Sequence, residues 1–267
     1  WGSRLLVGTA RFVPVALLLL SGTAQAAAVS AQATPTGGKV VAGSAKIAYP
    51  SKGQMKVTQK SDRAIIDWKS FNIGASASAE FIQPKSTSLA VNRVTGKTSD
   101  PTQILGSLKS NGRLMVLDSN GVIFGKNATI DVGGIIASTG SINAKEVMSG
   151  ARKITIRNAN KGAIINEGTI TAAEGGLVAF VAPSVTNSGV IQARLGRVAL
   201  AAGNNVTVDL YGDQLIELAV GSELANALGL ERTTLGRYLS TLMELDLIQV
   251  LKPVTGKEKT KNTVYSL

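Results

Sequence analysis

The spacing of apolar and polar residues divides the chain into three parts. An apolar run occupies residues 12–20, short stretches of alternating apolar and polar residues follow to about residue 220, and from residue 222 apolar residues recur every three or four positions. Alternation is typical of β-strands, and the longer period is typical of helices. The pattern therefore predicts a leader at 1–26, a mainly β domain at 27–221 and a small α/β tail at 222–267.

The first part has the form of a secretory signal peptide. Arg4 and Arg11 precede the apolar run, and the small residues after it end in the A-x-A pattern of a cleavage site at residues 24–26. The run is roughly half of the about 20 residues that a membrane-spanning helix needs. We expect cleavage after Ala26, or after Ala28, and export across the inner membrane.

The middle part contains an internal repeat with an offset of 21 residues. Placing residues 165–182 over residues 186–203 matches four pairs and aligns the strand positions 177, 179 and 181 with 198, 200 and 202; the pairs are Asn166 with Asn187, Gly168 with Gly189, Ile170 with Ile191 and Gly175 with Gly196. Short strands between glycine and asparagine corners at this spacing predict coils of a parallel β-helix, stacked about 4.8 Å apart. A β-sandwich of short alternating strands is the alternative.

Composition narrows the possible functions. The chain has 44% hydrophobic but only 4% aromatic residues and 29 glycines, which favours narrow stacked strands over a bulky core. It has no cysteine and no histidine, which excludes thiol catalysis, histidine acid–base chemistry and the usual zinc sites. We expect no cofactor and no metal. The net charge of +11 is spread along the chain, so we interpret it as solvation of a long surface.

Six segments of the middle part resemble a known family. They are "VVAGSAKI" (40–47), "AIIDWKSFNIG" (64–74), "AEFIQP" (79–84), "LAVNRVTG" (89–96), the run at 104–139 and "VTVDLYGD" (206–213). In order and spacing, residues 40–220 resemble the N-terminal secretion domain of filamentous haemagglutinin and related two-partner secretion exoproteins. The resemblance implies a right-handed parallel β-helix without enzymatic activity.

The same resemblance implies a route and partners. Such a domain is exported to the periplasm and recognised there by the periplasmic domains of a dedicated outer-membrane β-barrel transporter. The exported protein is typically an adhesin, a haemagglutinin or a toxin that is secreted or held at the cell surface. Because this chain starts at Trp1, has its first methionine at Met55 and stops where further coils would follow, we expect a fragment. A downstream region would contact host or bacterial cells.

The family's N-P-N-G-I motif falls on Asp118, Ser119, Asn120, Gly121 and Val122. Asn120 and Gly121 match, Val122 is a conservative change, and Asp118 and Ser119 depart from the motif. Asp-Ser-Asn-Gly still suits a tight turn, because an aspartate side chain caps such turns and Asn-Gly tolerates positive φ. The turn is either structural or a contact with the transporter. A second family motif, N-P-N-L, has no match.

Two carboxylates four residues apart, Asp209 and Asp213, suggest a weaker alternative. Enzymes that cleave polysaccharides use pairs of acidic residues. No other acidic residue lies near this pair in the sequence, so a carbohydrate-active enzyme ranks third among the functions considered.

The tail at 222–267 resembles a winged helix-turn-helix, most closely the C-terminal module of archaeal-type ATPases. In a DNA-binding regulator, the second helix would enter the groove and lysines 257, 259 and 261 on the wing would meet phosphates. The groove-facing residues would be Arg232, Thr233, Thr234 and Arg237. The tail has a net charge of only +1 (6 basic minus 5 acidic residues), so DNA binding is the second hypothesis. Because the secretion-domain pattern stops within a coil, we interpret the tail as a foreign graft that arose from a rearranged gene, a frameshift or an assembly artefact.

Overall fold

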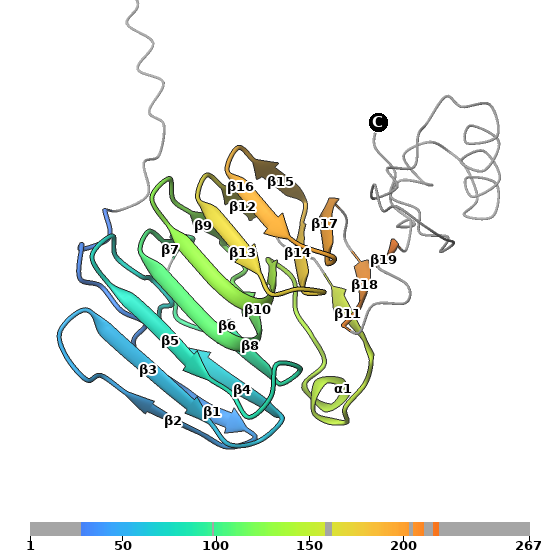
Figure 1. Cartoon of the computed structure of the whole chain (residues 1–267), viewed down its shortest axis with the longest axis horizontal. Coiled ribbons are helices and arrows are strands. Elements are labelled where there is room, and N and C mark those ends of the chain that lie inside the picture. The colour runs from blue at the N-terminus through green and yellow to red at the C-terminus, as the bar shows by residue number, and fades with distance from the viewer. Residues whose placement is uncertain (1–27, 98, 158–161, 203–204, 211–215, 219–267) are drawn as a thin grey trace, which may run out of the picture.

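The computed structural model describes residues 28–97, 99–157, 162–202, 205–210 and 216–218. These residues form a parallel β-solenoid of about six turns, as the repeat predicted (Figure 1). Each complete turn contributes one strand to each of three faces. No helix in the described part of the chain is long and apolar enough to cross a membrane.

Two faces are joined, because the long strands β8 (Ser107–Leu117) and β10 (Thr129–Ser138) each pass around the corner between them. The first face contains β1 (Lys39–Ala42), β4 (Arg63–Trp68), β6 (Leu89–Val94), the second halves of β8 and β10, β14 (Leu177–Ala182) and β17 (Arg197–Ala202). The second face contains β2 (Ala45–Ala48), β3 (Gln54–Gln59), β5 (Ser78–Ile82), the first halves of β8 and β10, β13 (Thr169–Ala172) and β16 (Val190–Ala193).

The third face is a four-stranded parallel sheet. It contains β7 (Thr102–Ile104), β9 (Gly121–Phe124), β12 (Ala163–Asn166) and β15 (Ser184–Asn187). Neighbouring strands pair in parallel on all three faces, except that β1 and β2 pair antiparallel with β4 and β3 at the N-terminal end.

The predicted 21-residue offset is confirmed over two faces. Asn166 pairs with Asn187 in the third face, and Ile170 pairs with Ile191 in the second. On the first face the offset is 20, because Leu177 pairs with Arg197. Gly196 accordingly packs against the backbone of Gly176 rather than Gly175, so the predicted alignment of positions 177, 179 and 181 with 198, 200 and 202 was wrong by one position. The corner before β14 contains one extra residue, and Gly175 (φ +72°) is part of it.

The interior of the solenoid is an apolar core. Its largest side chains are aromatic, and all are fully buried: Trp68, Phe71, Phe81, Phe124 and Phe180. Trp68 packs edge-on against Phe71 with ring centroids 5.5 Å apart, and Phe124 stacks on Phe180 at 5.6 Å. Among the described residues, every tryptophan and phenylalanine is therefore buried inside the narrow solenoid, whereas Tyr49 is half exposed.

A second apolar cluster lies on the outer side of the first face. It includes Ile65, Met115 and Ile136 from the solenoid, and it is covered by residues that leave the coil. The covering elements are the short helix α1 (Ala144–Met148) and an antiparallel sheet of β11 (Lys153–Arg157), β18 (Asn205–Asp209) and β19 (Ile216–Leu218), which lie beside the coils in Figure 1. From β4 to β14 the first face is thus buried on both sides, whereas Val41 of β1 and Val198 and Leu200 of β17 are exposed.

A buried arginine fastens this cover to the solenoid. Arg63, 8% exposed at the start of β4, donates from Nη1 to the carbonyl of Val147 at 2.6 Å and from Nη2 to the carbonyl of Ala151 at 3.0 Å. The two acceptors lie at the end of α1 and just after it, where helix carbonyls lack partners and a positive charge is favourable. Hydrogen bonds between residues that are 84 and 88 positions apart in the sequence therefore hold α1 and the turn after it against the solenoid.

Candidate functional site

The predicted motif forms the corner between β8 and β9. Gly121 N donates to the carbonyl of Asp118 at 3.0 Å, which closes a four-residue turn. Asp118 N donates to the carbonyl of Ser138 on the neighbouring coil at 3.1 Å. The turn is thus bonded within itself and to the coil beside it.

The carboxylate of Asp118 is the centre of the corner. It is 2% exposed and accepts three hydrogen bonds: from Thr102 N at 3.0 Å, from Thr102 Oγ1 at 2.7 Å and from Asn120 N at 3.0 Å. Burial raises the pKa of Asp118 above its usual value, and the hydrogen bonds from Thr102 and Asn120 offset part of that rise. The side chain therefore joins two successive coils of the third face, one through Thr102 and the other through its own turn.

Gly121 is required at its position for two reasons. Its φ of +121° is strongly unfavourable for residues with a side chain, and an added Cβ would lie 2.5 Å from the carbonyl oxygen of Ala163. The prediction of positive φ is confirmed here but does not extend to Asn120, because Leu195 is the only non-glycine residue with positive φ in the described ranges.

Most of the motif faces inward. Val122 is fully buried in the core, Asp118 and Gly121 are buried, and Asn120 is partly exposed. Only Ser119 is exposed. A partner docking on the folded domain would therefore meet one hydroxyl and part of one amide, and little of the motif itself.

The other candidate residues do not join this corner. Asp209 lies at the end of β18 and is 6% exposed, under the cover of the first face. Asp213 lies outside the described residues. The same holds for the predicted leader at 1–26 and for the predicted groove-facing residues Arg232, Thr233, Thr234 and Arg237.

Sequence reasoning missed the polar ladders that hold the other corners. Gln83 Nε2 donates to Gln59 Oε1 at 3.2 Å, and Ser110 Oγ donates to Gln83 Oε1 at 2.6 Å, so three successive coils are joined by buried amides and a hydroxyl. Asn166 Nδ2 likewise donates to Asn187 Oδ1 at 2.7 Å. Of these contacts, only the last had a signal in the sequence, because both residues occupy the same position in the repeat.

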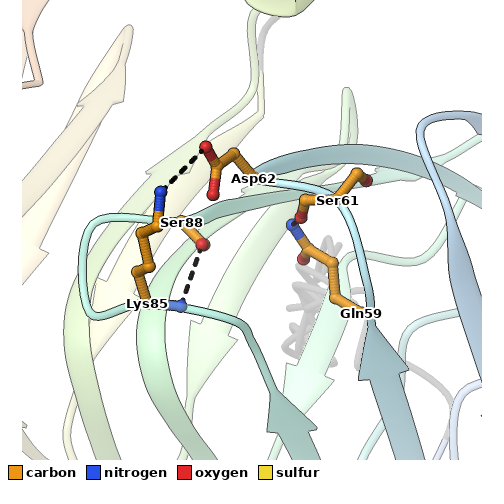
Figure 2. Close-up of polar contacts among 5 residues, drawn as sticks. All are labelled: Gln59, Ser61, Asp62, Lys85 and Ser88. Carbon is orange, nitrogen blue, oxygen red and sulfur yellow. Dashed lines mark hydrogen bonds and ion pairs between the residues drawn. The ribbon is translucent and has the colours of Figure 1, made fainter.

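Figure 2 shows the corner beside the first ladder. Gln59 Nε2 donates to the carbonyl of Ser61 at 2.6 Å, and Lys85 N donates to Ser88 Oγ at 3.1 Å. Lys85 Nζ also lies 3.4 Å from Asp62 Oδ2, but both side chains are about two-thirds exposed. Such an exposed ion pair contributes little to stability, so the hydrogen bonds of the buried Gln59 and Gln83 side-chain amides hold this corner.

Comparison with known proteins agrees with this architecture. The haem/haemopexin-binding protein of Haemophilus influenzae is 34% identical over 212 residues, which are 77% of this chain and 23% of that protein. The crystal structure of the HMW1 secretion domain from Haemophilus influenzae is 31% identical, with a TM-score of 0.60 over 66% of this chain and 47% of that one. The filamentous haemagglutinin secretion domain matches at 15% identity and a TM-score of 0.48. The chain spans about a quarter or less of its curated relatives.

A family match also covers the tail. The family described as "TPS secretion domain" matches residues 31–264, which includes most of the segment predicted to be a winged helix-turn-helix. The winged-helix prediction and the idea of a grafted tail are not borne out, and nothing favours the DNA-binding alternative. Helical spacing over 46 residues indicates secondary structure but does not identify a family.

The matched range, the coil architecture and the relatives agree on one assignment. Two-partner secretion domains of this kind belong to exoproteins of the haemagglutinin and haem-binding type, and they are recognised by an outer-membrane transporter. Their proteins pass through the periplasm and the outer membrane and are secreted or held at the surface. The chain belongs to the TPS secretion domain family.

Proposed function

We propose that the domain is read by the periplasmic domains of its transporter before it folds. The observation that carries this is the burial of the motif: Asp118, Gly121 and Val122 are hidden in the folded coil. In the unfolded chain all five residues 118–122 are accessible. In the folded domain the same residues hold a corner of the solenoid together. The transporter therefore binds them before folding, and they stabilise the coil after it.

We also propose boundaries for the leader and the secretion domain. Residues 1–26 are the leader and are removed, and the secretion domain begins at residue 27. The start of the family match at residue 31, shortly after the A-x-A pattern, supports this limit. The extent of the match to residue 264 supports including the residues past 221 in the same functional unit.

The cargo is the part of the exoprotein downstream of this domain. We propose that the full-length protein binds haem or haemopexin, or a host or bacterial cell surface, through that region, since curated relatives named for haem and haemopexin binding are four or more times longer than the matched segment. The domain itself acts as an address and has no catalytic role.

Secretion into the medium, measured with and without the transporter gene, tests the address function. We expect the chain in the medium only when the transporter is present, and equal secretion from both strains would refute it. Binding to the purified periplasmic domains tests the order of events. The chain diluted from denaturant should bind more tightly than the folded chain, and equal affinity would show that the motif is not read before folding.

A further inference from the structure

A small cavity lies at the outer edge of the first face, away from the 118–122 turn. Its volume is about 140 Å³, and it is lined by residues of β8, of β14 and β17 with the corners before them, and of the end of β18 in the covering sheet. The lining residues used below are Arg113, Leu177, Arg197, Asp209 and Leu210. One water occupies about 30 Å³ in the liquid, so the cavity has room for a group larger than water.

Strand register brings the two arginines together. Arg113 pairs with Gly134, and Leu177 pairs with Arg197, so the two arginines stand in one row on β8 and β17 with β10 and β14 between them. Three strand spacings separate their backbones by about 14 Å. An added Cβ at Gly134 would lie 3.5 Å from Cγ of Arg113, so the Arg113 side chain runs across this glycine toward β14. Both arginines line the same cavity.

Arg197 lines this cavity and carries a buried donor without a partner in the part of the chain that the structure describes. Its Nη1 is inaccessible to solvent and has no hydrogen-bond partner among the described residues. A buried donor without an acceptor is costly, and guanidinium forks match the paired oxygens of carboxylates, phosphates and sulfates. The described residues thus supply no acceptor for a donor of a side chain that lines the cavity.

The charges in the lining favour an anion. Arg113 and Arg197 contribute two positive charges, and Asp209 contributes one negative charge. The lining therefore has a net charge of +1 in a space of lowered dielectric, and a single anion would balance it. Leu210 lines the site from the covering side.

We propose that this cavity binds a small oxyanion of the carboxylate, phosphate or sulfate class. The anion bridges the guanidinium groups of Arg113 and Arg197 and thereby joins the last coils of the solenoid to the strand that ends at Asp209. The covering sheet is then anchored at two points, by Arg63 near α1 and by the anion at β18.

Thermal unfolding of the whole chain at constant ionic strength provides the test. Phosphate, sulfate or acetate replaces chloride in parallel titrations, which separates tetrahedral oxyanions from a carboxylate. At saturation at least one of the three should raise the melting temperature by about 2 °C or more, because a ligand that binds only the folded state stabilises it. No rise with any of them would overturn the proposal.

Variants assign the effect to the cavity. Arg197→Gln and Arg113→Gln should each abolish the rise, whereas Arg194→Gln, which removes an exposed arginine three residues from Arg197 and outside the lining, should keep it. Circular dichroism confirms that each variant is folded. Calorimetric titration of the wild-type chain with inorganic phosphate and sodium acetate should detect binding to a single site. An equal rise in Arg197→Gln and wild type would refute the site.

Discussion

Gly121→Ala tests the corner of the motif most directly. Alanine at φ +121° lies well away from the left-handed well near +57°, and strain of this kind costs about 1–3 kcal/mol. The new Cβ would also lie 2.5 Å from the carbonyl oxygen of Ala163 and 3.2 Å from its nitrogen, and relief of such overpacking costs about 1–3 kcal/mol more. The free energy of unfolding should therefore fall by about 2–6 kcal/mol, which corresponds to about 4–24 °C in melting temperature.

Gly175→Ala is the matched control for this change. Gly175 also has positive φ, at +72°, but an added Cβ there would meet no atom within 4 Å. Its cost should be limited to the backbone term of about 1–2 kcal/mol. Urea unfolding followed by circular dichroism measures both variants. If Gly121→Ala is no less stable than Gly175→Ala, the backbone of Ala163 does not confine the turn and the account of this corner is wrong.

Two further predictions concern buried charges. Because burial raises the pKa of Asp118 in the folded state, the wild type should gain stability relative to Asp118→Asn as pH falls from 7 to about 4, and urea unfolding at several pH values measures the difference. Arg63→Ala should cost about 2–4 kcal/mol, because it removes two buried hydrogen bonds to α1 and its following turn, whereas Lys85→Ala at an exposed ion pair should cost less than about 0.5 kcal/mol.

The sign of the pH effect follows from proton binding. Between the unfolded and folded pKa values of Asp118, the folded state binds more protons than the unfolded state, so stability falls as pH rises through that window. Asparagine at this position has no such dependence. A pH profile parallel to that of Asp118→Asn would contradict the raised pKa. If Lys85→Ala lowers the free energy of unfolding as much as Arg63→Ala does, the difference in burial between the two side chains does not determine what their contacts contribute.

The repeat made the solenoid predictable from the sequence, because side chains that stack on one another occupy equivalent positions. Asn166 and Asn187 show this at a corner, and Ile170 and Ile191 show it in the core. The one-residue error at Gly175 arose because corners vary in length while strands do not. The apolar pattern recurs in both copies of the repeat, but it does not show in which corner the extra residue lies.

The cover of the first face was not predicted. β11 and β18 pair antiparallel across about fifty residues, and no local pattern encodes such a partner. A signal did exist: β14 reads LVAFVA without alternation, as expected for a strand that is buried on both faces. The hydrogen bonds between Asp118 and Thr102 were missed for a similar reason, since they depend on the register of successive coils.

The position of β18 determines when the first face can be sealed. If the chain emerges from its transporter N-terminus first, the coils up to β14 have their strand neighbours before residue 205 is available, but Ile154 and Ile156 of β11 have no partner strand until then. The outer apolar side of these coils stays incompletely covered through this interval, and closing a long loop makes its final covering slow. The fold is therefore complete only after β18 has formed. Until then the nascent solenoid exposes an apolar surface on the first face, where it can associate with other chains.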